Sequence, residues 1–150
     1  WQLSGHDIQL LCWAGALHEI GVAVSQKNYS QHSAYLVLNT DLPGFSQQDQ
    51  EFMATLISGL KGKFRTALLE RVPSKRQKTV TRMITLLRLA VILKHAEVLE
   101  ELPDFLVSAT SSILTLTFPN GWRDLHPLTI WEIEQGLPSM EKLGVSIKLR

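Results

Sequence analysis

LCWAGALHEIGVAVSQKNYSQHSAYLVLNTDLPGF, residues 11–45, is the stretch that decides how the fold is interpreted. A His18-Glu19 pair closes one apolar helical pattern, and a His32-Ser33 pair opens the next. The stretch ends in Leu-Pro-Gly-Phe, whose proline and glycine are typical of a chain reversal. Two interpretations are open: the remains of a metal site, or a well-packed helical hairpin.

Upstream of the histidine pair, the sequence predicts a central helix. Ser4 is a suitable N-cap, Asp7 suits the positive end of the helix, and Gly21 supplies the stop. Apolar residues cover most of the surface of this helix, so we expect it to be buried. Cys12 is therefore expected as a buried small hydrophobe, and Trp13 as a core residue.

The patterns that follow predict further helices as far as about residue 100. Their expected positions are a second helix over residues 29–38 capped by Ser30, a third after Ser46, a short one over residues 64–72, and a long fourth one capped by Ser74. Each has apolar residues at helical spacing, or begins at a residue suited to capping.

The last third of the chain predicts a small mixed unit. Residues 105–110 and 113–118 are rich in β-forming residues and are separated by Ser-Ser, which indicates a hairpin. Pro127 suits the start of a helix, and Pro138 predicts a kink or break in it. The alternative is a strand over residues 128–133 followed by a short helix. Residues 145–149 alternate and predict a last strand.

The expected fold class is mainly α: a helical bundle followed by a small α+β unit. The small unit would hold a short antiparallel sheet with one kinked or broken helix. The domains are expected to be residues 1–102, all helical, and residues 103–150. A chain of 150 residues with 45% hydrophobic content is long enough and apolar enough to bury a core.

The totals place few limits on function. The formal net charge is +1, so the total charge does not indicate any class of binding partner. One cysteine forms no internal disulfide and fits a reducing compartment, which predicts a cytoplasmic protein. The longest apolar run, residues 84–93, is broken by Arg88 and is too short to cross a bilayer. The chain begins at Trp1, so we expect it to be part of a longer polypeptide.

Basic residues gather in the middle of the chain. Residues 61–82 hold eight of the fifteen Lys and Arg residues and one acid, Glu70. The eight are the candidate phosphate-binding residues: Lys61, Lys63, Arg65, Arg71, Lys75, Arg76, Lys78 and Arg82. Lysine and arginine side chains attract a phosphate chain by charge, and arginine grips single phosphates through paired hydrogen bonds. A solvated surface is the competing interpretation.

Five pieces in the same order support a family resemblance. They are LHEIG at 17–21, HSAYL at 32–36, NTDLPGF at 39–45, ATL at 54–56 and LLRLA at 86–90. They resemble the C-terminal half of the bacterial exopolyphosphatase and guanosine pentaphosphate phosphohydrolase family. LTLTFPNGW at 114–122 and HPL at 126–128 are closer to the guanosine pentaphosphate branch.

The resemblance implies a fold and a division of labour. Members hold their catalytic site in N-terminal actin-like domains, which bind phosphate chains and magnesium. The C-terminal half resembles an HD-type helical domain followed by a small α+β domain. The implied partners are polyphosphate or guanosine pentaphosphate, the missing actin-like domains, and a second copy in a homodimer. No cofactor is expected in this chain, no membrane is implied, and the chain alone is expected to be inactive.

The same resemblance weakens the metal interpretation of His18-Glu19. HD-type sites need several His and Asp ligands from separate helices, because each ligand fills only one or two positions around the metal. The pair matches the His-Asp dipeptide with Glu in place of Asp, but Val91 stands where a later aspartate is expected. Leu60 stands where exopolyphosphatases often carry a histidine. We therefore interpret the pair as vestigial and assign no catalytic or metal residue.

Three functions stay open at this stage. The first is an accessory module that extends a polyanion path and supports dimer assembly. The second is a helical nucleic-acid or protein adaptor that uses the same basic residues. The third, an independent HD-type phosphohydrolase, requires a divalent ion at His18 and Glu19.

Overall fold

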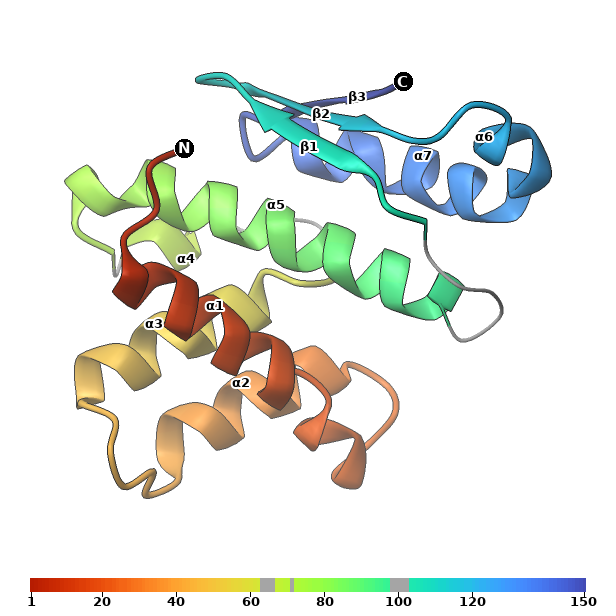
Figure 1. Cartoon of the computed structure of the whole chain (residues 1–150). Helices are drawn as coiled ribbons and strands as arrows, with labels where there is room; N and C mark the ends of the chain where they lie inside the picture. Colours follow the sequence, from red (N-terminus) through yellow and green to blue (C-terminus); the bar gives the residue numbers. More distant parts are fainter. Residues whose placement is uncertain (63–66, 71, 98–102) are drawn as a thin grey trace. The chain divides into compact units, whose positions relative to one another are not determined.

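The computed structural model describes residues 1–62, 67–70, 72–97 and 103–150 (Figure 1). Its elements are, in chain order, α1 (Gly5–Leu17), the 3-10 helix η1 (Ile20–Ala23), α2 (Tyr29–Asn39), α3 (Gln47–Ser58), α4 (Ala67–Glu70), α5 (Ser74–Glu97), β1 (Leu106–Ala109), β2 (Ile113–Thr117), α6 (Trp122–Leu125), α7 (Pro127–Glu141) and β3 (Ser146–Leu149). They form two compact units: an N-terminal unit, Gln2–Leu87, and a C-terminal unit, Arg88–Arg150 together with Trp1. The helical body and the small α+β part are both confirmed.

Two helices of the N-terminal unit begin where their caps predict. The Ser4 hydroxyl accepts from the Asp7 backbone N–H, and the Asp7 carboxylate accepts from the Ser4 backbone in return. Ser46 and Asp49 repeat this reciprocal arrangement at the start of α3. Each capping box satisfies backbone donors that a helix start leaves without a partner inside the helix.

The predicted cap of α2 is wrong by two positions. The N-cap is Asn28, which has a positive φ of 59°, and Ser30 lies inside the first turn, where it is buried. Asparagine tolerates this left-handed conformation better than most residues because its short polar side chain can hydrogen-bond to nearby backbone. The prediction favoured serine for its capping hydroxyl, but that side chain is used in packing instead.

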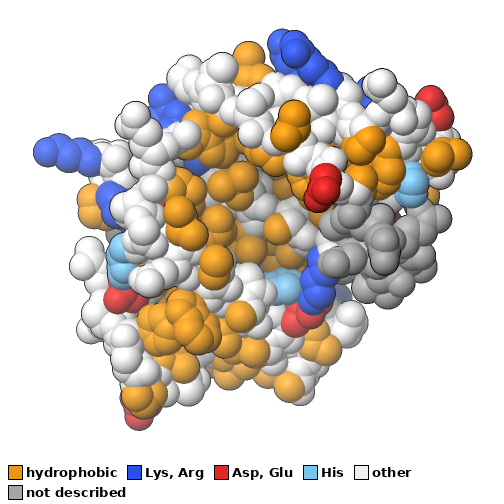
Figure 2. Space-filling view, viewed as in Figure 1, with side chains coloured by type: hydrophobic (Ala, Val, Ile, Leu, Met, Phe, Trp, Pro, Cys, Tyr) orange, Lys and Arg blue, Asp and Glu red, His pale blue; other side chains and the backbone are white. Residues whose placement is uncertain are grey.

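The core of the N-terminal unit lies between one face of α1 and the helices α2, α3 and α5. Leu10 and Ala14 of α1 are buried, as are Met53, Leu56 and Ile57 of α3. The prediction that α1 is buried all round is wrong. Its outer face reaches the surface, and Figure 2 shows hydrophobic side chains there.

Two residues of that outer face correct the sequence interpretation directly. Cys12 is exposed rather than buried. Trp13 is 50% exposed and packs edge-on against Phe45, with ring centroids 5.5 Å apart, so it is not a core residue. A helix that is apolar on all sides gives no sequence signal for which face is covered, and neighbouring helices decide it.

The middle of the chain is described in part. Within the predicted helix 64–72, the described residues form α4 over Ala67–Glu70, while residues 63–66 and 71 lie outside the described residues. The long helix α5 begins at Ser74 as predicted. The compact units divide inside α5, between Leu87 and Arg88. The predicted domain boundary at 102/103 adjoins residues 98–102, which are not described, so it stays a prediction.

The C-terminal unit is a three-stranded sheet with α7 on one face. β1 and β2 form the predicted antiparallel hairpin, closed by Ser111 and Ser112. β3 then pairs with β2 in parallel, so the sheet is mixed rather than antiparallel. The sheet order is β1-β2-β3, and Leu114, Leu116 and Phe118 are buried. The parallel pairing follows from α7, which carries the chain back between β2 and β3.

Helix α7 is continuous, so neither the break nor the strand alternative over residues 128–133 is correct. It starts at Pro127 as predicted and contains Pro138 in its last turns. Ile133 and Met140 are both fully or almost fully buried, on either side of the proline. This packing holds the helix together, although proline removes one backbone hydrogen bond.

Candidate functional site

Within residues 11–45, the helices α1, η1 and α2 meet in a closely packed helix junction. The Ser33 hydroxyl donates to the His18 carbonyl oxygen at 2.7 Å and accepts from the Gly21 backbone N–H at 2.8 Å. Ser33 has no exposed surface. A Cβ atom at Gly21 would lie 2.3 Å from the Ser33 nitrogen and 2.3 Å from the Tyr29 carbonyl oxygen. Only glycine fits this approach, so the junction has a structural explanation.

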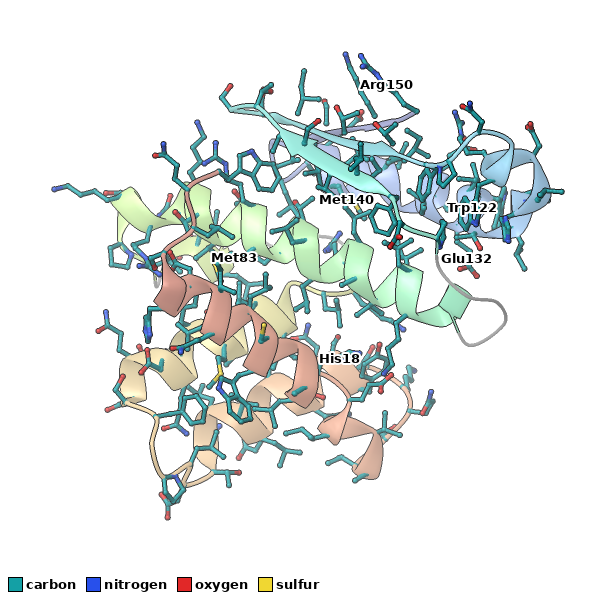
Figure 3. The ribbon with its side chains drawn as sticks, in the orientation of Figure 1. His18, Met83, Trp122, Glu132, Met140 and Arg150 are labelled. Carbon is teal, nitrogen blue, oxygen red and sulfur yellow. The ribbon has the colours of Figure 1, made fainter. Side chains whose placement is uncertain are left out.

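His18 lies at the C-terminal end of α1, with 3% of its surface exposed (Figure 3). Its Nδ1 lies 2.6 Å from the Gly15 carbonyl oxygen, and its Nε2 lies 3.6 Å from Glu19 Oε1. The His18 ring therefore contacts a backbone carbonyl oxygen of its own helix, α1. Among the described residues, no group of three His, Cys, Asp or Glu side chains is placed to hold a metal ion. Val91, at the position expected for a later ligand, is buried and apolar.

Two other histidines have structural contacts, each within its own unit. His6 Nε2 lies 2.8 Å from Asp49 Oδ1, which links the start of α1 to the start of α3. His126 stacks on Trp122 with centroids 4.1 Å apart, and its Nδ1 lies 2.8 Å from the Trp122 carbonyl oxygen. The pKa of Asp49 is lowered, first by the Ser46 hydroxyl, against the effect of burial and with help from His6.

Two of the eight candidate phosphate-binding residues are engaged inside the N-terminal unit. Arg76 Nη2 lies 2.6 Å from Oδ1 of the buried Asp7, and the Arg76 guanidinium lies 4.8 Å from the Phe52 ring centroid. Lys61 Nζ lies 4.4 Å from the Tyr29 ring centroid. These contacts give Arg76 and Lys61 structural roles that the sequence could not reveal.

Asp7 holds its charge through these contacts. Burial would raise the pKa of Asp7, but hydrogen bonds from the Ser4 hydroxyl and backbone, together with Arg76, outweigh it and leave the pKa below its ordinary value. An ionised carboxylate in this position fixes the Arg76 guanidinium. We therefore count Arg76 as part of the packing of α1 on α5.

Three further candidates lie on α5. Lys75, Lys78 and Arg82 are spaced by three and four residues, which places them on one side of the helix. Lys75 and Lys78 are exposed and Arg82 is partly buried. We call these three the α5 basic side. Lys63, Arg65 and Arg71 lie outside the described residues.

The sequence analysis missed a second set of cations, in the C-terminal unit. Lys148 and Arg150 are exposed, and Lys148 pairs with Thr115 in the strand register, on the sheet face opposite α7. Figure 3 shows the Arg150 side chain pointing away from α7. Arg123 Nη1 lies 3.5 Å from the Leu149 carbonyl oxygen. The alternation Ser-Ile-Lys-Leu-Arg at the chain end was the available signal, since alternate residues of a strand share one face.

A groove of about 910 Å³ opens in the N-terminal unit. Leu10, Ala34 and Phe52 lie in its lining, together with the paired charges of Arg76 and Asp49. A volume of this size suits a small molecule or a peptide segment. Because both of these charges already have partners in the protein, the groove is a poor site for a phosphate chain.

Comparison with known proteins gives a family match over most of the chain. Residues 1–136 match the family profile described as Ppx/GppA phosphatase, domain III. The chain is 31% identical over 150 residues to the guanosine-5'-triphosphate,3'-diphosphate pyrophosphatases of Aeromonas salmonicida and Aeromonas hydrophila, covering 99% of this chain and 30% of each relative. For the protein of that name from Pseudoalteromonas translucida, identity is 31% over 145 residues, covering 96% and 29%. The chain thus spans less than a third of these relatives.

The sequence analysis predicted that no apolar run is long enough to cross a bilayer. None of the helices over the described residues is both long enough and apolar enough to span a bilayer.

Proposed function

Because the chain belongs to the Ppx/GppA phosphatase family, we propose that it is the C-terminal accessory module of a cytoplasmic phosphohydrolase acting on guanosine pentaphosphate or polyphosphate. In this role it holds the anionic substrate and contributes to assembly as a homodimer. The observation that carries the proposal is the family match over residues 1–136, joined to relatives named as guanosine pentaphosphate pyrophosphatases. The chemistry itself is assigned to actin-like N-terminal domains and their magnesium.

The arrangement around His18 supports an accessory role. A hydrolytic metal site needs three or more ligands and an open position for water or substrate. The described residues offer the His18-Glu19 pair alone at this position, and the His18 ring is occupied on one side by the Gly15 carbonyl oxygen. We therefore assign His18 and Glu19 to the helix junction.

The α5 basic side is the proposed contact for the phosphate chain. Lys75 and Lys78 carry their charges into solvent, where a flexible polyanion can reach them. Exposed charge pairs are weak individually and are screened by salt, with a Debye length of about 8 Å at physiological ionic strength. Binding through this surface is therefore expected to be modest and strongly dependent on salt.

A binding titration tests the proposal. Long-chain polyphosphate and guanosine pentaphosphate are titrated against the wild-type chain and the Lys75→Ala/Lys78→Ala double variant, at low salt and again near 0.5 M. We expect the double variant to bind polyphosphate roughly 5–30-fold more weakly, from about 0.5–1 kcal/mol per exposed charge.

The matched control removes two exposed lysines elsewhere, Lys27→Ala/Lys142→Ala. It changes the net charge equally and is expected to bind within about twofold of wild type. Equal weakening in both variants would mean that only net charge matters, and the α5 basic side would no longer be a site. Stronger competition by RNA or DNA than by polyphosphate would favour the adaptor function instead.

A further inference from the structure

The two edges of the sheet in the C-terminal unit are built differently. At the β3 edge, the Ser146 and Arg150 N–H groups bond to β2, so the Leu149 carbonyl oxygen points away from the sheet and is met by Arg123. Exposed Lys148 and Arg150 add charge along this strand. Charged side chains on an edge strand discourage pairing with another chain. The β3 edge is therefore protected.

Among the described residues, β1 itself carries no charged side chain, and the contact nearest to its edge is the hydrogen bond from Trp1 Nε1 to the Thr110 carbonyl oxygen, just after the strand ends. All four residues of β1 are exposed, with Leu106 at 76% and Val107 at 54%. The segment from Phe105 to Ser112 carries no charged residue and no proline. An open, uncharged and apolar edge strand is a template for adding another strand.

The backbone groups that face outward on β1 follow from its register. The Thr110 N–H bonds to the Ile113 carbonyl oxygen at 2.8 Å, and Leu106 lies opposite Thr117. In an antiparallel ladder the bonding residues alternate, so positions 106, 108 and 110 face β2. The N–H and C=O groups of Phe105, Val107 and Ala109 consequently point away from β2.

This outward set is complementary to itself. Two β1 strands paired antiparallel about Val107 place Val107 opposite its own copy and Phe105 opposite Ala109 of the partner. The twofold symmetry repeats the Phe105–Ala109 pair, so there are three opposite pairs, and each exchanges two hydrogen bonds. Asp104 then faces Thr110 of the partner, so no like charges meet. A twofold symmetric contact of this kind is the commonest way for identical chains to close a dimer.

We infer that the β1 edge is the surface through which two copies of this chain join, forming one continuous six-stranded sheet. The inference rests on the homodimer in the proposed function and specifies where that contact lies. Val107 and Phe105 of each copy extend the apolar face that Leu114 and Leu116 begin. Strands of this length bury less than the roughly 1,200 Å² of a stable interface, so we expect association in rapid exchange.

Disulfide trapping tests the register directly. In a Cys12→Ser background, which removes the exposed native thiol, Val107→Cys places two thiols on the twofold axis. Opposite residues that exchange hydrogen bonds have Cα atoms about 5.5 Å apart, which a disulfide can bridge. Oxygen with a copper catalyst oxidises the two thiols, and the dimer is measured on a non-reducing gel. We expect Val107→Cys to be trapped in minutes.

The matched control is Leu106→Cys in the same background. In the inferred register the two copies of position 106 are diagonal, roughly 7–8 Å apart, and should be trapped at least tenfold more slowly. Equal trapping at both positions, or none at Val107→Cys, would overturn the inference.

Sedimentation of Val107→Pro gives a second readout. Proline is tolerated on the outer side of an edge strand but removes the N–H on the axis in both copies. Losing two hydrogen bonds predicts roughly 30-fold weaker self-association. A dimer that survives Val107→Pro and resists Val107→Cys trapping would contradict the β1 edge while leaving homodimer assembly intact. Loss of polyphosphate binding alone would contradict only the other half of the proposed function.

Discussion

Replacing Ser33 by alanine should destabilise the helical junction strongly, although Ser33 looks unremarkable in the sequence. Its hydroxyl is fully buried and satisfies two backbone groups at once, the Gly21 N–H and the His18 carbonyl oxygen. Alanine leaves both without this partner in a place that water does not reach. A buried polar group left unsatisfied costs about 1–3 kcal/mol. We therefore expect the free energy of unfolding to fall by about 2–4 kcal/mol.

The assay is urea unfolding at pH 7, followed by far-UV circular dichroism for the wild type and two alanine variants. Ser58→Ala is the control, because the Ser58 hydroxyl donates to Gln31 Oε1 at an exposed site. That variant should change the free energy of unfolding by less than about 0.5 kcal/mol. If Ser33→Ala also stays within about 0.5 kcal/mol of wild type, the account of the junction is wrong.

Gly21→Ala tests the same junction from the other side. The added methyl group would lie 2.3 Å from two backbone atoms, so α2 or η1 must shift. Overpacking of this kind costs about 1–3 kcal/mol and sometimes more. Because Gly21 and Ser33 share one hydrogen bond, the double variant should lose clearly less than the sum of the two single losses.

Two further predictions concern the Asp7-Arg76 pair. The folded pKa of Asp7 lies below its ordinary value of 3.8, so the Asp7 charge stabilises the fold above that pH, and this stabilisation is lost as the pH falls through the folded pKa. The difference in free energy of unfolding between wild type and Asp7→Asn, measured by urea unfolding, should therefore shrink between pH 6 and pH 2.5. A difference that stays constant over this range would contradict the argument. Arg76→Ala should lower the free energy of unfolding by about 1–2 kcal/mol, a value discounted because Arg76 is partly exposed. The control Lys75→Ala removes an exposed charge and should change the free energy of unfolding by less than about 0.5 kcal/mol. Equal effects of the two variants would show that the ion pair contributes nothing.

The parts of the fold that sequence predicts well are those decided locally. Ser4 and Ser46 start their helices through bonds that span three residues, and the Ser111-Ser112 hairpin is closed by its own flanking strands. The cap of α2 is the local exception, because Asn28 uses a backbone conformation rather than a side-chain bond. A capping side chain can be recognised in a sequence more readily than a residue that takes a left-handed backbone conformation.

The parts that sequence did not predict depend on contacts between distant segments. The parallel pairing of β3 with β2 joins residues more than thirty positions apart, as Ile113 and Ser146 show. Pro138 stays inside α7 because buried residues on either side hold the helix. The exposed side of α1 likewise depends on which neighbours cover Leu10 and leave Trp13 outside.

The candidate site shows the same division. Sequence located the concentration of positive charge between residues 61 and 82, but it could not show that Arg76 is paired with Asp7, 69 residues away. It also could not show that Lys61 lies over the Tyr29 ring. Charge composition predicts a field, whereas the charges available to a ligand are those that the fold leaves without an internal role.

The most direct test of the central claim measures binding and phosphate release side by side. This chain is incubated with guanosine pentaphosphate or long-chain polyphosphate and magnesium, and released phosphate is followed while a parallel titration records binding. The account predicts binding at low salt with no release above the protein-free control. Release that disappears in His18→Ala would contradict it, because it would mean that His18 belongs to a working hydrolase site and not to a helix junction.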